Sequence, residues 1–230
     1  RLPPTPNYLR ANNSVMEQLI HHTGALDREM QSNLSPQDAL SWLLAGHDRY
    51  KADTTKSRDR NALFEGAKQG QFPYAAILGC IDSRAPIERI FDAQSGDLFV
   101  ARVAGNVINN DVIGSLEYAC KYAGTPVIFV LGHTSCGAVA AAWNDVKDGH
   151  ITDLLATIKP AVSNTKARVG DDASTANLNA CSAENVALMC KGLTDESAIL
   201  AELVDQGKVA IAGGVYNVET GNINLVVNPF

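Results

Sequence analysis

The stretch PVIFVLGHTSCG (residues 126–137) joins a run of apolar residues to a short loop that carries a histidine and a cysteine. The run Pro126–Leu131 has the length of a buried strand. A second apolar run, Tyr74–Gly79, leads in the same way directly into Cys80. We therefore expect two buried strands that each end on side chains able to bind a metal or attack a substrate.

Short apolar runs alternate with longer helical patterns along most of the chain. This alternation is typical of a parallel sheet with crossover helices. Leu98–Val103 and Val209–Val215 supply two further strands, and a turn at Glu219–Asn222 adds Ile223–Val227 as an antiparallel edge strand. The predicted fold class is α/β, with a mostly parallel four-stranded central sheet, one antiparallel edge strand, flanking helices and an N-terminal helical arm.

Helical patterns fill the segments between these strands. They cover Pro86–Phe91, then Val112–Ala123 closed by Gly124, and a long region from Ala138 to Asp205. Pro160 and the polar segment Val169–Asn179 are expected to interrupt the long region, because proline removes a helical hydrogen bond.

Length and composition exclude several classes of protein. The chain has 230 residues, of which 46% are hydrophobic and 19% charged, as in one ordinary globular domain. A net charge of −6 argues against a nucleic-acid partner, because phosphate binding depends on clustered cations. No apolar run approaches the roughly 20 residues that a membrane-spanning helix needs. We expect a soluble protein, cytoplasmic by default, or located in a periplasm or organelle if a leader before Arg1 was removed.

Two of the five cysteines stand where ligands bind in an open parallel sheet. Cys80 and Cys136 follow strands, and His133 precedes Cys136 by three positions, so the carboxyl ends of the strands can bring all three together. Two thiolates and one imidazole suit zinc, and three protein ligands leave a fourth position open, as in catalytic zinc sites. The other thiols lie in helical patterns without a neighbouring ligand and are expected in the core: Cys120, Cys181 and Cys190.

Taken alone, Cys80 or His133 would more often be a core residue than a ligand, and only their combination favours a metal site. The remaining histidines are expected at the surface or at helix ends: His21, His22, His47 and His150.

Asp82 and Arg84 lie in a loop, since Pro86 disfavours helix at the preceding residue. Either Asp82 caps the next helix beside an ion pair, or its carboxylate lies next to the metal and Arg84 keeps it from binding the metal.

Two motifs together resemble the β-carbonic anhydrases: CxDxR at residues 80–84 and GHxxCG at residues 132–137. Gln71, Phe99 and Tyr118 resemble pocket residues of the plant-type subgroup. The similarity runs from about Ser35 to the last strand, and segments 96–106 and 114–119 also resemble the family. The resemblance implies the reversible hydration of carbon dioxide to bicarbonate and a proton, by attack of zinc-bound hydroxide. One Zn²⁺ per chain would be held by Cys80, His133 and Cys136.

The resemblance also implies roles for residues around the metal. Asp82 would orient the hydroxide, and Arg84 would keep Asp82 ionised and turned away from the metal, whereas a closed form of the family uses this aspartate as the fourth ligand. We expect the open form. Substrate-binding residues would be Gln71, Phe99, Tyr118 and Gly137, although a loop amide and core aromatics would explain the first three equally. Ile81 and Ala138 depart from the common family pattern, which bears on the pocket and not on the ligands.

The family assembles as dimers whose N-terminal helices embrace the partner. Ser14 with Glu17 is a capping-box signature that begins a helix predicted to reach Met30, and a second helix is predicted from Ser35 to Tyr50. We expect residues 1–50 to form this arm and residues 51–230 to form a single α/β zinc-binding catalytic domain. The expected assembly is a homodimer, with a homotetramer as the alternative.

Other kinds of protein fit the sequence less well. A zinc-dependent alcohol dehydrogenase would need a nucleotide-binding GxGxxG motif after a strand, and the sequence has none. A thiol-redox protein would need a resolving CxxC partner for Cys80, which is also absent. A binding module without turnover would have no reason to keep an ionised Asp82 beside an open metal position.

Overall fold

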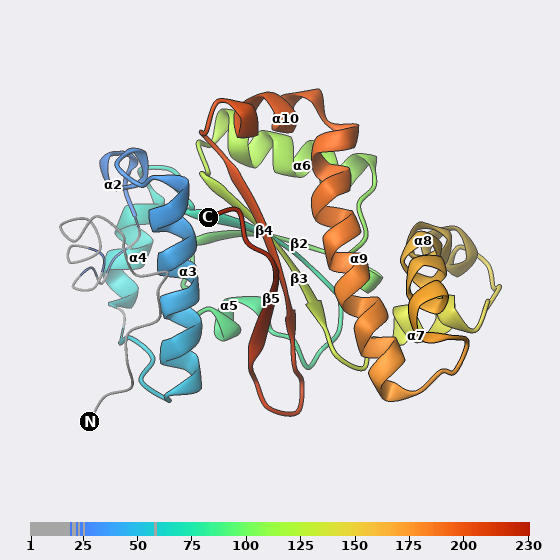
Figure 1. The fold of residues 1–230 in the computed structure, drawn as a ribbon. Coiled ribbons are helices and arrows are strands. Elements are labelled where there is room, and N and C mark those ends of the chain that lie inside the picture. The colour runs from blue at the N-terminus through green and yellow to red at the C-terminus, as the bar shows by residue number, and fades with distance from the viewer. Residues whose placement is uncertain (1–18, 20–21, 23, 25, 58) are drawn as a thin grey trace.

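A five-stranded sheet in the order β2-β1-β3-β4-β5 forms the centre of the molecule (Figure 1). The computed structural model describes residues 19, 22, 24, 26–57 and 59–230. Four strands are parallel and the edge strand β5 is antiparallel to β4, which confirms the predicted fold class. The strands are β1 (Ala75–Gly79), β2 (Leu98–Arg102), β3 (Val127–His133), β4 (Ala210–Tyr216) and β5 (Ile223–Val227).

Helices lie on both faces of this sheet (Figure 1). Before β1 come α2 (Arg28–Ser32), α3 (Pro36–Lys51) and α4 (Arg60–Ala67). Between β1 and β3 come α5 (Ile87–Ile90), the 3₁₀ turn η1 (Ala104–Asn106), α6 (Asn110–Glu117) and the π-helical turn η2 (Tyr118–Tyr122). Between β3 and β4 come α7 (Gly137–Trp143), α8 (Ile151–Val169), α9 (Thr175–Glu196) and α10 (Ala198–Asp205).

The sheet separates two hydrophobic layers because successive residues of a strand point to opposite faces. Ile128 and Val130 of β3 pack in the layer formed with α6 to α10, whereas Phe129 and Leu131 pack in the layer formed with α3 and α5. Every residue of β1 and β3 is buried. The two central strands are therefore held from both sides, and their carboxyl ends are fixed in place.

The N-terminal predictions are confirmed for one helix and corrected for the other. α3 begins at the predicted serine, where Ser35 and Asp38 form a reciprocal capping box. The predicted helix from Ser14 to Met30 lies mostly outside the described residues, and its end is wrong. Asp27 has an extended backbone and its side chain accepts a hydrogen bond from Met30 N, so a separate helix, α2, begins there.

The predictions for Pro160 and His47 are wrong. Pro160 does not interrupt the long helical region but lies inside α8. Both Pro160 and Ala156 face outward, so water can reach the Ala156 carbonyl that proline leaves without a donor. His47 is not a surface residue: only 7% of it is exposed, and its Nδ1 lies 3.2 Å from Ile90 O.

Helix ends elsewhere follow the predicted breaks. α8 ends before Gly170, which has a φ of 86°, and α9 begins at Thr175 after the cap of Ser174. Among the described residues, no helix has both the length and the apolar character that crossing a membrane requires.

Candidate metal centre

Three side chains meet at the carboxyl ends of the two central strands. Cys80 directly follows β1, His133 ends β3, and Cys136 immediately precedes α7. β1 and β3 are parallel neighbours, so their ends lie side by side. The two sulfurs and the imidazole nitrogen all lie within 4.8 Å of one another, and all three residues are buried. The structure thus brings together the three residues predicted as ligands.

The imidazole of His133 is oriented as a metal ligand requires. Its Nδ1 lies 2.9 Å from Thr134 O, which fixes the ring and leaves Nε2 as the free nitrogen. Nε2 is buried and, within the described part of the chain, has no hydrogen-bond partner. A buried polar atom without a partner is costly. A cation between Nε2 and the two sulfurs would remove this cost, so the residues present fit a zinc ion.

The electrostatics of the two thiols also favour a metal. A hydrogen bond from Cys136 is the main reason that the pKa of Cys80 is lowered to about 4, and His133 and the Gly105 N–H contribute. The pKa of Cys136 is raised, because it keeps the proton that it shares with Cys80. One thiolate is therefore favoured before any ion binds. Metal binding would release the second proton.

Asp82 borders the metal position and is held by Arg84. Arg84 donates to Asp82 Oδ1 from its backbone N (2.9 Å) and Nε (3.0 Å), and to Oδ2 from Nη2 (2.8 Å). The Arg84 side chain is the main cause that lowers the pKa of Asp82 to about 2. Asp82 Oδ2 lies 3.8 Å from His133 Nε2. Helix α5 starts after Pro86 without a side-chain cap, so Asp82 is not the cap of the following helix.

Two further side chains, which the sequence did not single out, hold the ligand loops. Arg102 donates from Nε to Cys80 O (2.8 Å) and from Nη2 to Asp82 O (2.6 Å). Asn179 of α9 accepts from Ser135 N at 2.9 Å, in a loop where Ser135 has a φ of 56°. These contacts involve backbone groups of the ligand loops, so no spacing of residue types in the sequence signals them.

The predicted substrate-binding residues lie in different places within one chain. Phe99 and Tyr118 line a hollow of about 650 Å³ between β2 and α6, and Gln71 lines another of about 420 Å³. Neither hollow is lined by a predicted ligand. Phe99 pairs with Ala76, four residues before Cys80, which corresponds to about 13 Å along the strand. Only Gly137, the first residue of α7, adjoins the metal centre.

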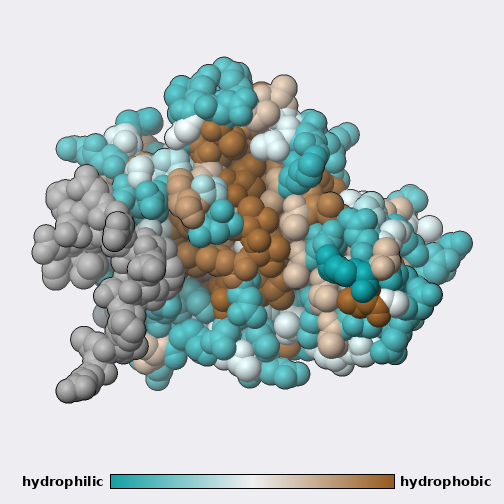
Figure 2. Space-filling view, viewed as in Figure 1, coloured by the Kyte–Doolittle hydropathy of each residue, from teal (hydrophilic) through white to brown (hydrophobic). Residues whose placement is uncertain are grey.

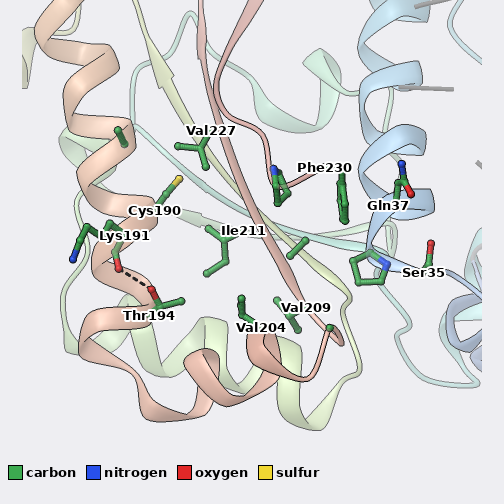
Figure 3. Close-up of a pocket in the computed structure, with 15 residues that line it drawn as sticks. Ser35, Gln37, Cys190, Lys191, Thr194, Val204, Val209, Ile211, Val227 and Phe230 are labelled. Atoms are coloured by element: carbon green, nitrogen blue, oxygen red, sulfur yellow. Dashed lines mark hydrogen bonds between the residues drawn. The ribbon is translucent and has the colours of Figure 1, made fainter. Parts of the chain in front are cut away.

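The other three cysteines are buried, as predicted. Burial raises the pKa of Cys120 and of Cys190 to about 12. Cys190 also lines an apolar hollow of about 600 Å³ with Ile211, Val227 and Phe230 (Figure 3). This hollow belongs to the apolar surface between α3 and α9 (Figure 2). None of the metal-centre residues lines it, so Cys190 is not part of the centre.

The fold and the donor set together define an open-sheet α/β protein in which three side chains could hold a metal ion. The model of the family described as carbonic anhydrase matches residues 75–223. Carbonic anhydrase 2 of Mycobacterium tuberculosis is 35% identical over 202 residues, which cover 84% of this chain and 94% of the relative. The chain belongs to the carbonic anhydrase family.

Solved structures agree with this assignment and indicate the β class. A β-carbonic anhydrase of Aspergillus fumigatus superposes with a TM-score of 0.66 at 26% identity, over 84% of this chain and 93% of that one. A tetrameric β-carbonic anhydrase of Sordaria macrospora has the same fold, with a TM-score of 0.67 at 22% identity over 82% of this chain and 96% of that one.

Proposed function

We propose that this chain catalyses the zinc-dependent, reversible hydration of carbon dioxide to bicarbonate and a proton. The observation that supports it most strongly is the buried Nε2 of His133, which has no hydrogen-bond partner among the described residues and lies among two thiols, 3.8 Å from an ionised aspartate. Cys80, His133 and Cys136 would hold the ion. When bound there, zinc supplies Lewis-acid activation of a water molecule, whose pKa falls from about 16 to about 7.

Asp82 would orient the attacking oxygen. Its Oδ2 borders the metal position, so it can accept a hydrogen bond from the activated water and direct a lone pair at the carbon of carbon dioxide. An ionised carboxylate only accepts hydrogen bonds. The lowered pKa of Asp82, about 2, keeps it in this acceptor state throughout the neutral range.

Arg84 would keep the site in the open form. Both carboxylate oxygens of Asp82 accept hydrogen bonds from Arg84, whose Nη2 also donates to Ser135 O at 3.2 Å. A carboxylate held in this way is kept from turning toward the ion as a fourth ligand. This geometry supports the proposal that the chain has the open, plant-type arrangement.

We further propose that the substrate pocket is completed by a second copy of the chain. Phe99 lies about 13 Å along the sheet from Cys80, and it shares with Tyr118 a hollow that none of the proposed ligands lines. Tyr118 and Tyr122 stack with ring centroids 5.9 Å apart, and 53% and 73% of these residues are exposed. An exposed aromatic pair beside the unpaired edge of β2 is suited to a protein interface. A homodimer would bring this surface to the partner's metal centre.

Metal removal tests the proposed function. Dialysis against a chelator should abolish carbon dioxide hydration, and one equivalent of Zn²⁺ per chain should restore it, because in the proposed mechanism the ion activates the water. Magnesium is the control ion, since thiolate ligands select against it. Hydration that survives complete zinc removal would refute the proposal. Restored zinc content without restored hydration would favour a binding module.

A further inference from the structure

Asn185 is a buried polar residue on the face of α9 that packs toward the metal centre. Only 1% of it is exposed. Its Nδ2 donates to Gly105 O at 2.9 Å, and its Oδ1 has no hydrogen-bond partner among the described residues. Burying an amide that is only half satisfied is costly. An apolar side chain of similar size would avoid this cost, so stability alone does not explain an asparagine here.

The contact of Asn185 is made with a turn that touches Cys80. Gly105 lies in η1, and its N–H donates to Cys80 Sγ at 3.3 Å. The same residue therefore accepts from Asn185 through its carbonyl and donates to the sulfur through its N–H. Asn106, on the other side of the bonded peptide, has a buried Nδ2 that also lacks a partner in the described part of the chain.

The turn needs an external support because its backbone is unusual. Gly105 has a φ of 68° and Asn106 a φ of 46°, both in the left-handed region. A Cβ at Gly105 would come within 2.6 Å of Ile158 Cδ1, so a side chain there would displace Ile158 as well as strain the backbone. Two successive left-handed residues persist only when surrounding contacts fix them. Within η1, Asn106 N donates to Val103 O at 2.9 Å. From α9, Asn185 Nδ2 adds a hydrogen bond to Gly105 O.

We propose that Asn185 is a positioning residue for the metal centre. By holding the Gly105 carbonyl, it aims the Gly105 N–H at Cys80 Sγ and so fixes the position of the sulfur. Some residues do not bind a metal but hydrogen-bond to its ligands and orient them. Removing such a residue commonly changes metal affinity or activity about 10- to 100-fold. This role rests on the proposed function only in that Cys80 is taken as a zinc ligand.

The test compares Asn185→Leu with a matched core variant, Cys190→Ala, on the same helix. Cys190 is also buried, and its thiol donates to Ala212 O at 3.5 Å, so the control perturbs α9 without touching η1. The zinc dissociation constant is measured by chelator competition, and the sulfur-to-metal absorption band is recorded on the Co²⁺-substituted protein. Asn185→Leu should weaken zinc binding about 10- to 100-fold and shift the band. Cys190→Ala should change neither.

Equal zinc affinity in the wild type and Asn185→Leu would overturn the proposal, as would equal weakening in both variants. If Asn185→Leu fails to fold, the zinc dissociation constant of Asn185→Ser is compared with that of the wild type instead. The serine side chain is too short for its hydroxyl to reach Gly105. A wild-type protein that binds zinc without hydrating carbon dioxide would refute the proposed function. In that case the ratio of zinc dissociation constants would still decide the role of Asn185.

Discussion

Asp82 has two contacts that set its chemistry. The Arg84 side chain donates a hydrogen bond to each carboxylate oxygen at 2.8–3.0 Å, and His133 Nε2 lies 3.8 Å from Oδ2. The pKa of about 2 means that Asp82 loses its charge only in strong acid. Cys80, His133 and Cys136 would therefore bind the metal, whereas Asp82 would orient the nucleophile.

Substituting each kind of residue should give different results. Asp82→Asn should keep zinc, because Asp82 is turned toward Arg84, and should lose turnover about 10- to 100-fold, because an amide can also donate and no longer fixes the hydrogen-bond direction. Cys136→Ala should lose zinc and activity together. Metal analysis and stopped-flow rates on both variants check this. Loss of zinc from Asp82→Asn would show that Asp82 is a required ligand.

At the scale of helices and strands, the sequence predicts most of the fold because apolar runs mark the buried strands. The same reasoning locates the ligands, since β1 and β3 are parallel neighbours and their ends meet. Prediction from the apolar pattern fails where another contact decides where a helix begins or whether a residue is buried. Asp27 starts a new helix by capping it, and the burial of His47 depends on the packing of α3 against α5. Arg102, Asn179 and Asn185 act on backbone groups, which residue types alone do not reveal.

Pro160 gives a prediction at the same scale. Because it lies inside α8 on an exposed face, Pro160→Ala should restore one helical hydrogen bond without a steric clash. We expect the free energy of unfolding to rise by about 1–2 kcal/mol, since the greater freedom of the unfolded chain offsets part of the gain. Chemical denaturation with far-ultraviolet circular dichroism measures this. A lower stability would mean that the Pro160 ring packs against something essential.

At the scale of the whole molecule, one chain contains the metal ligands together but not the predicted pocket. Cys80, His133 and Cys136 converge within 4.8 Å, whereas Phe99 and Tyr118 open onto a separate hollow. The sequence motifs mark the ligands and the family resemblance implies the pocket residues, but neither says that the two sets lie apart in the fold. A second copy of the chain would reconcile the two observations.

Tyr122→Arg tests this assembly, because 73% of Tyr122 is exposed in one chain. A charge in a buried apolar interface is unfavourable, so the variant should sediment as a monomer and lose turnover while it retains zinc. Val169→Arg, at the exposed end of α8, is the matched control and should leave both properties unchanged. A monomeric Tyr122→Arg protein with full turnover would show that each chain works alone.

The rate of carbon dioxide hydration by the zinc-loaded wild-type protein, followed by stopped flow with a pH indicator, tests the proposed function. We expect a rate above that of buffer, proportional to protein concentration, with kcat/KM of at least about 10⁴ M⁻¹s⁻¹. The rate should be measured at about pH 7 and about pH 8.5, on either side of the range in which zinc-activated water loses its proton. Full zinc occupancy with no rate above buffer at either pH would show that the chain is not a carbon dioxide hydratase.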